Sequence, residues 1–276
     1  NIAIFSLRKL TFLYKYKILL YLFVFSLGFL SSFSLPPYNL FYLNFFSYPA
    51  LLWVLLLNSK NKIISFNLGW TFGFGFFISN LYWLTNSLTF EDTFKTLIPF
   101  ALILIPLFLG LFYGISTLVF SFSNPKKNIL SILILATTLS LFEYIRSFMF
   151  GGFPWNLISF SFVNYLEFIQ LLSITGTYAF NSIIIFIFLM PTILFFNLKK
   201  NIKLSIFFLS IILFSFNHFW GKSSLRQYEL NDKRDLGFTV KIISPKINIK
   251  RFFQNEDPIE FISELIYISE PNLSNK

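Results

Sequence analysis

The stretch Leu141-Phe-Glu-Tyr-Ile-Arg146, followed by Gly151-Gly-Phe-Pro-Trp155, places a carboxylate and a guanidinium between long apolar runs. Glu143 and Arg146 are three residues apart, so both lie on one face of a helix. Ionisable groups at the edge of a hydrocarbon layer are costly, and they therefore indicate a functional site. The alternative interpretation is a salt bridge that ends a helix near the membrane interface, with Trp155 as an aromatic anchor.

The composition around this stretch is that of an integral membrane protein. Hydrophobic residues make up 55% of the chain and charged residues 12%, whereas about a quarter of a soluble domain is charged. The net charge is +10, but the Lys residues form small clusters between apolar runs, as topology signals do, and we expect no nucleic-acid partner. The chain contains no cysteine, which excludes a disulfide framework and a thiolate nucleophile within it.

Uncharged runs predict an all-α polytopic membrane domain over residues 1–220, with about seven transmembrane helices of about 20 residues each. Pro36-Pro37 divides the first run into two spans, because proline cannot donate a helical hydrogen bond. Residues 151–170 are rich in Gly, Pro and Asn and are expected to form a loop. The expected spans are residues 18–35, 38–57, 63–85, 96–122, 129–148, 171–197 and 204–220.

Small and aromatic residues indicate contacts inside this domain and at its edge. Gly69-Trp-Thr-Phe-Gly73, with Gly75 beyond it, has a spacing that lets helix backbones approach closely, so we expect helix packing there. Tyr82 and Trp83 are expected at the membrane interface. His218 is also expected to be an interfacial side chain, because the chain has no second His and no Cys to complete a metal site.

The distribution of charge predicts the orientation in the membrane. With the amino terminus in the cytoplasm, the Lys residues of the connections at 58–62, 124–128 and 198–203 lie on the inner side, as the positive-inside rule requires. The outer side before the tail then carries Lys95 and Arg146, together with the acidic residues. Spans of about 20 residues predict seven crossings. With a cytoplasmic amino terminus, seven crossings place the tail on the outer side of the membrane.

The composition of the chain changes from apolar to charged at Gly221, where the tail begins. Charged residues predict a solvated linker over residues 221–236, and residues 237–244 alternate in hydrophobicity as a strand does. Asp257 at a cap position, followed by Pro258, predicts the start of a helix. Residues 237–276 thus have the pattern of the beginning of an α/β domain. Because the chain begins with Asn rather than Met and stops within this pattern, we interpret it as a fragment that is open at both ends.

Two motifs resemble the apolipoprotein N-acyltransferases, bacterial inner-membrane enzymes that add the last acyl chain to lipoproteins. E-Y-I-R followed by G-G-F-P-W is similar to the family's E-[FYL]-[LI]-R-G and G-F-P-W segments, and residues 69–77 with Leu81-Tyr-Trp83 are similar to its G-x-x-x-G-x-G-x-F and W segment. The resemblance runs from about Leu20 to the end of the chain. The chain departs from the pattern at Ser147, where Gly is usual, and at Ser159-Phe-Ser161, where Gly-Tyr-Ser is usual.

The resemblance implies that the membrane domain is followed by an α/β domain of the carbon–nitrogen hydrolase (nitrilase-like) type, whose start the tail resembles. Arg251-Phe252-Phe253 stands where the family usually carries a Lys-Trp pair. In the family this domain supplies a Glu–Lys–Cys triad, whose Cys takes an acyl chain from a phospholipid and passes it to the diacylglyceryl-cysteine of an apolipoprotein. No catalytic residue is assigned in this chain, because it has no Cys and the Glu is expected beyond Lys276. The chain alone is therefore expected to be inactive.

The resemblance also implies a phospholipid acyl donor, a diacylglyceryl-apolipoprotein acceptor, and a place in the cell inner membrane with a periplasmic tail. It implies no cofactor and no metal. Glu143, Arg146, Phe153 and Trp155 are the candidate lipid or substrate contacts. Arg146 is expected to bind a phosphate at the headgroup level, oriented by Glu143, while Phe153 and Trp155 line the lipid entrance. Two other classes stay open, a membrane transporter or permease subunit and an inactive truncated product.

Overall fold

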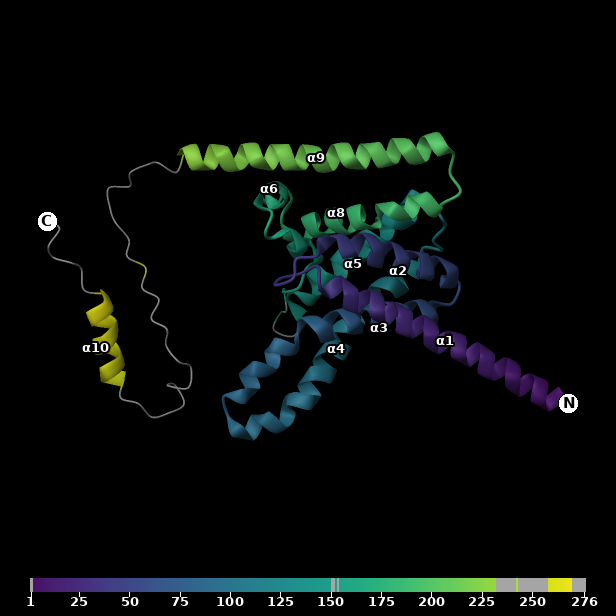
Figure 1. Cartoon of the computed structure of the whole chain (residues 1–276), viewed down its shortest axis with the longest axis horizontal. Coiled ribbons are helices and arrows are strands. Elements are labelled where there is room, and N and C mark those ends of the chain that lie inside the picture. Colours follow the sequence, from purple (N-terminus) through teal and green to yellow (C-terminus); the bar gives the residue numbers. More distant parts are fainter. Residues whose placement is uncertain (1, 150–151, 153, 232–241, 243–257, 270–276) are drawn as a thin grey trace.

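The computed structural model describes residues 2–149, 152, 154–231, 242 and 258–269, which form an all-helical chain without a strand. Figure 1 shows α2, α3, α5 and α8 gathered into one bundle, with α9 running along its side next to α6. The long helices are α1 Ile2–Ser32, α2 Asn44–Asn58, α3 Lys62–Asn80, α4 Ile98–Phe122, α5 Ile129–Arg146, α8 Thr177–Leu189 and α9 Lys200–Asn231. The shorter elements are η1 Phe41–Leu43, η2 Tyr82–Thr89, η3 Asp92–Leu97, η5 Ile158–Phe162, α6 Leu166–Ile169, α7 Leu172–Thr175, η6 Met190–Phe195 and α10 Pro258–Ser269.

Five helical stretches in the described part of the chain are long and apolar enough to cross a membrane, which indicates a multi-pass membrane protein. They are Phe41–Asn58, Asp92–Phe122, Ile129–Arg146, Thr177–Phe195 and Lys200–Leu230. Two further predicted spans are helical but fall short of this measure. α1 contributes the shorter apolar stretch Tyr16–Ser32, and α3 contains glycines together with Asn67, which lower its hydropathy.

Asparagine side chains start two of the long helices at turns that the sequence predicts. Asn61 Oδ1 accepts a hydrogen bond from the backbone N of Ile64 at 3.1 Å and caps α3. Asn128 Oδ1 accepts one from the backbone N of Ser131 at 3.2 Å and caps α5. Such a cap satisfies a backbone donor that the first helical turn leaves unpaired. Both helices therefore begin close to the predicted positions.

Glycine allows α3 to contact α1 and α4 at very short range. A Cβ placed on Gly73 would lie 2.9 Å from the Cα of Gly110 on α4. Gly28 on α1 faces the backbone carbonyl of Phe72, and Gly75 faces the backbone of α1 in turn. Close backbone contact favours association in a membrane, where burying apolar surface between helices contributes little. The predicted packing role of the glycine motif is confirmed.

The sequence predicts one span over residues 171–197, but the structure divides this segment. Gly176 has a φ of +75°, in the left-handed region, so α7 ends there and α8 begins at Thr177. Beyond α8 the chain continues as the 3-10 helix η6, with Pro191 in its first turn. The stretch that can cross a membrane is therefore Thr177–Phe195, which begins later than predicted.

The seventh predicted span, residues 204–220, is part of a longer helix. α9 runs without interruption to Asn231, through residues that the sequence predicts as the start of a charged linker. Lys, Arg and Glu favour the helix even where they are solvated, and this explains the difference. Gly221 lies inside α9, where the missing Cβ leaves room for the backbone carbonyl of Glu167 on α6.

Two predictions concern the tail. The strand predicted over residues 237–244 lies almost entirely outside the described residues. The helix predicted to begin at Pro258 is confirmed as α10, Pro258–Ser269.

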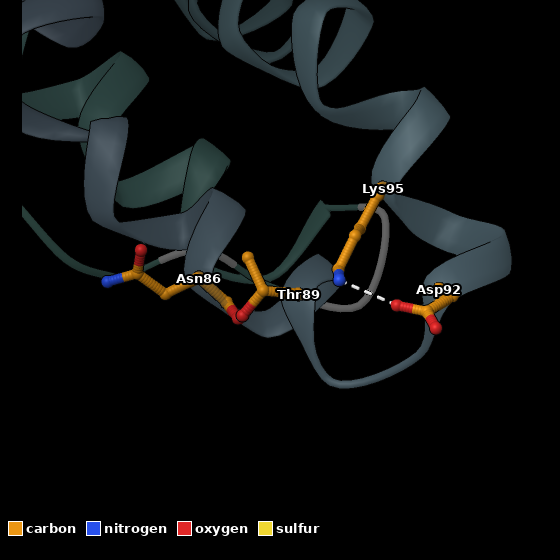
Figure 2. A network of polar contacts seen from close by, with 4 residues as sticks. All are labelled: Asn86, Thr89, Asp92 and Lys95. Carbon is orange, nitrogen blue, oxygen red and sulfur yellow. Dashed lines mark hydrogen bonds and ion pairs between the residues drawn. The ribbon is translucent and has the colours of Figure 1, made fainter.

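The connection between α3 and α4 is formed by η2 and η3, so the α-helical part of the third span ends earlier than predicted, at Asn80. Figure 2 shows polar contacts inside this connection. Thr89 Oγ1 donates to the backbone carbonyl of Asn86 at 2.7 Å, and Lys95 Nζ pairs with Asp92 Oδ1 at 2.6 Å. Both side chains of the ion pair are mostly exposed, so the pair contributes little to stability.

Replacing Gly73 by Leu should destabilise the bundle, because the added side chain has no room between α3 and α4. Overpacking of this kind costs about 1–3 kcal/mol, and we expect a lower midpoint of thermal unfolding in detergent. The matched control is Thr137→Leu, which adds bulk on an exposed face of α5. Equal midpoints for the two variants would contradict the close packing of α3 on α4.

Candidate functional site

The carboxylate of Glu143 lies in the core, where two side chains from other helices donate hydrogen bonds to it. Glu143 is 1% exposed and belongs to the last turns of α5. Tyr113 Oη, from α4, donates to its Oε1 at 2.7 Å, and Asn181 Nδ2, from α8, donates to its Oε2. Charge-assisted hydrogen bonds of this type are stronger than neutral ones, and they offset part of the cost of burying a carboxylate. The carboxylate therefore connects three helices.

Asn181 extends these contacts to the loop that follows α5. Its Nδ2 also donates to Ser140 Oγ at 3.1 Å, and its Oδ1 accepts from the backbone N of Ser159 at 2.9 Å. Ser159 belongs to η5, so the amide links α8 both to α5 and to the loop. We call Tyr113, Ser140, Glu143, Ser159 and Asn181 the Glu143 cluster. All five residues are buried.

A second set of buried polar side chains lies on α1 and α2. Ser31 Oγ donates to Asn44 Oδ1 at 2.7 Å, which joins α1 to α2. Tyr48, on α2, is fully buried, and its ring packs against Phe72 of α3 at 5.6 Å between centroids. Buried polar side chains therefore also join α1 to α2. In a medium without water, such side chains are stabilised by one another.

Arg146 is buried as completely as Glu143 and fixes the backbone of the loop. It is 1% exposed, and its Nη2 donates to the backbone carbonyl of Trp155 at 3.0 Å. The guanidinium lies over the ring of Phe77, 5.0 Å from the ring centroid. The ring of Phe77 in turn packs edge-on against Tyr113, at 5.8 Å between centroids. Arg146 therefore joins the loop to α3 and to the Glu143 cluster.

Trp155 lies at the surface, where it forms one wall of a cavity. Its side chain is 49% exposed and stacks on Trp83, with 5.4 Å between centroids and 29° between planes. A cavity of about 530 Å³ opens beside this pair, which we call the tryptophan cavity. It is lined by Leu35, Pro36, Asn80, Trp83, Trp155, Asn156, Phe160 and Val163. The walls are apolar except for two Asn side chains and the indole N–H groups.

The structure brings three of the four predicted site residues into two connected layers. Glu143 and Arg146 are both buried on α5, and neither lines the tryptophan cavity, so a direct contact of either with lipid stays a prediction. Trp155 lies in the outer layer and is connected to Arg146 through its own carbonyl. Phe153 lies outside the described residues. His218, expected at the interface, packs on the ring of Phe168 at 5.0 Å between centroids.

Sequence reasoning missed Tyr113 and Asn181 as partners of Glu143. A signal for Asn181 was present, because it is an amide inside the apolar run of α8, and a polar side chain in such a run needs a partner. Tyr113 carried no such signal among the many aromatic residues of the chain. The stacking of Trp83 on Trp155 was missed as well, since the two residues belong to different motifs.

Tyr113→Phe should destabilise the protein more than Tyr144→Phe, which changes an exposed tyrosine one residue from Glu143. Loss of a hydrogen bond to a charged group costs about 1.5–3 kcal/mol, whereas the exposed hydroxyl exchanges its bond with solvent. The measurement is the free energy of unfolding in mixed micelles. If both variants lose the same amount, the bond between Tyr113 and Glu143 contributes nothing to the fold.

Comparison with known proteins identifies the family. Residues 27–190 match the profile of the apolipoprotein N-acyltransferase N-terminal domain. The chain is 30% identical over 258 residues to the apolipoprotein N-acyltransferase of Agrobacterium fabrum, an alignment that covers 88% of this chain and 46% of the relative. It is 30% identical over 230 residues to the enzyme of Allorhizobium ampelinum, covering 80% of this chain and 42% of the relative.

The enzyme of Sinorhizobium fredii is 31% identical over 176 residues, covering 60% of this chain and 33% of the relative. The chain thus spans less than half the length of these relatives. The profile match includes both motifs, the Glu143 cluster and the tryptophan cavity. The chain belongs to the apolipoprotein N-acyltransferase family, with its N-terminal membrane domain as the matched part.

Proposed function

We propose that this chain is the membrane part of an apolipoprotein N-acyltransferase, which holds a phospholipid acyl donor and a diacylglyceryl-apolipoprotein acceptor for transfer of the acyl chain. The observation that carries the proposal is the tryptophan cavity in a chain of this family. Two indole rings and two amides around an apolar space suit a lipid at the headgroup level, where amphipathic aromatic rings are favoured. Both substrates are lipids that stay in the bilayer, so their reactive ends meet at its surface.

In this proposal, Glu143 and Arg146 position the wall of the cavity. Arg146 holds the carbonyl of Trp155, and Asn181 connects Glu143 to Ser159, so both charged residues act on the same loop. The guanidinium has a fixed planar fork, which suits it to a carbonyl in a defined place. Direct contact of Arg146 with a phosphate stays a prediction, and so does a lipid contact of Phe153.

The acyl transfer itself is assigned to a nitrilase-like domain of the kind that the tail resembles. The chain contains no cysteine to carry a thioester, so in our proposal the Glu–Lys–Cys triad comes from outside these 276 residues. In this proposal, α10 belongs to the beginning of that domain. We further propose that α1 and α3 complete seven crossings with the five apolar stretches.

Transport is the competing function class, and the contacts of Glu143 argue against it. Charged residues in transport pathways line a cavity near the middle of the membrane. Glu143 instead accepts two hydrogen bonds inside a packed core, and it does not line the tryptophan cavity.

The substrate role of the cavity is tested by acyl transfer from phosphatidylethanolamine to a diacylglyceryl peptide, measured with the full-length enzyme. Trp83→Ala and Arg146→Lys should each lower the rate per folded protein, the first by removing a ring of the wall and the second by replacing the planar fork. An aromatic pair contributes about 0.5–1.5 kcal/mol, so we expect a loss of about two- to tenfold for Trp83→Ala.

The matched control is Trp53→Ala, which removes an indole that lies under Lys127 and outside the cavity. It should keep the wild-type rate once the amount of folded protein is equal. Wild-type rates for both Trp83→Ala and Arg146→Lys would refute the role of the cavity in substrate binding. Absence of any acyl transfer by the full-length wild type would refute the family activity for this protein.

We also propose that the amino terminus is cytoplasmic and that the segment after α9 is periplasmic, because Lys residues cluster at the connections 58–62, 124–128 and 198–203. The chain has no native cysteine, so single-cysteine labelling is clean. A thiol reagent that does not cross the membrane should label Ser87→Cys in spheroplasts and spare Asn61→Cys. Labelling at Asn61 and protection at Ser87 would reverse the proposed orientation.

A further inference from the structure

A second cavity, of about 230 Å³, lies between α9 and the segment formed by α8 and η6. We call it the lateral cavity. Apolar side chains of α2, α8, η6 and α9 line it, together with Lys203 and Ser210. It shares no residue with the tryptophan cavity. Both helical stretches that border it are long and apolar enough to cross a membrane, so we expect the lateral cavity to lie at the depth of the hydrocarbon.

α9 is attached to the bundle at both ends of the lateral cavity. At its start, Lys203 Nζ donates to the backbone carbonyl of Leu194 at 2.9 Å. Farther along, the ring of Phe214 stacks on Phe168 at 4.5 Å, and Asn217 Nδ2 donates to the carbonyl of Phe168 at 3.0 Å. Figure 1 shows α9 passing along the bundle over this whole distance.

The dimensions of the lateral cavity match one leaflet of a bilayer. The side chains of α9 that line it run from Lys203 to Phe214, a rise of about 16 Å along the helix. Half of the hydrocarbon thickness of a bilayer is about 15 Å. Lys203 is the charged end of this space and Phe214 the apolar end. A lipid has the same order, with its headgroup at the surface and its chain directed to the midplane.

The charge at the Lys203 end of the lateral cavity favours an anionic headgroup. Lys199 immediately precedes α9, Lys200 is the first residue of the helix, and Lys203 follows about one turn later. Residues 177–217 contain no Asp or Glu, so no acidic residue of α8, η6 or this part of α9 opposes them. Each Lys near an anionic lipid surface contributes to binding through electrostatic attraction.

We propose that the lateral cavity holds one acyl chain of an anionic phospholipid from the surrounding bilayer, with its headgroup among Lys199, Lys200 and Lys203. This lipid fills the space between α9 and the bundle. It is separate from the acyl donor that we assign to the tryptophan cavity, and its binding does not depend on acyl transfer.

The proposal is tested in phosphatidylcholine nanodiscs that contain a minority of phosphatidylglycerol, with brominated acyl chains on one lipid or the other. A small fluorophore is attached to Ser210→Cys, inside the lateral cavity, or to Leu209→Cys, which is 55% exposed and at nearly the same depth. At Ser210, quenching by brominated phosphatidylglycerol should exceed its share of the lipid. At Leu209, quenching should follow the lipid composition.

Changing Lys199, Lys200 and Lys203 together to Gln should reduce the preference at Ser210, by about fivefold for each Lys that contacts the headgroup. Native mass spectrometry of the unlabelled chain should show retained phosphatidylglycerol in the wild type and its loss in the triple Gln variant, with equal elution and unfolding midpoints as the folding control. A preference that persists in the triple variant would overturn the proposal. Quenching at Ser210 in proportion to the lipid composition would also overturn it. So would the absence of quenching by either lipid, which would mean that a protein helix fills the space.

Discussion

The buried carboxylate of Glu143 is the constraint on which the arrangement of the bundle depends. A polar group without a partner in an apolar medium is costly, so the helices that carry its donors must lie within hydrogen-bond distance of it. Tyr113 and Asn181 come from α4 and α8, on either side of α5. Three helices are thereby held at a fixed depth and rotation, which apolar contact in a lipid environment does not specify on its own.

The same contacts connect the core of the bundle to its surface. Asn181 reaches the loop at Ser159, and Arg146 reaches it at the carbonyl of Trp155. The loop then places an indole ring against Trp83 at the edge of a cavity. The loop thus gains a defined position from two buried side chains. Precise placement of a binding wall requires such support from rigid elements.

Sequence reasoning predicted the class of the fold well and the interior of the site in part. Apolar runs, charge clusters and the glycine motif depend on local pattern, and α2, α4, α5 and the α3 packing follow it. The break at Gly176 and the length of α9 were not predicted, because backbone φ and solvated helical turns leave no hydropathy signal. The donors to Glu143 are 30 and 38 residues away along the chain, and only folding brings them together.

Arg146 binds Trp155 through a backbone carbonyl, a group that every residue type possesses. The attachment of the loop is therefore independent of which side chain occupies position 155. A substitution there alters the surface of the tryptophan cavity and leaves the anchor in place. The chemistry of the cavity wall and the architecture of the bundle are thus separable at this position, and the wall can diverge between homologues while the scaffold beneath it stays the same.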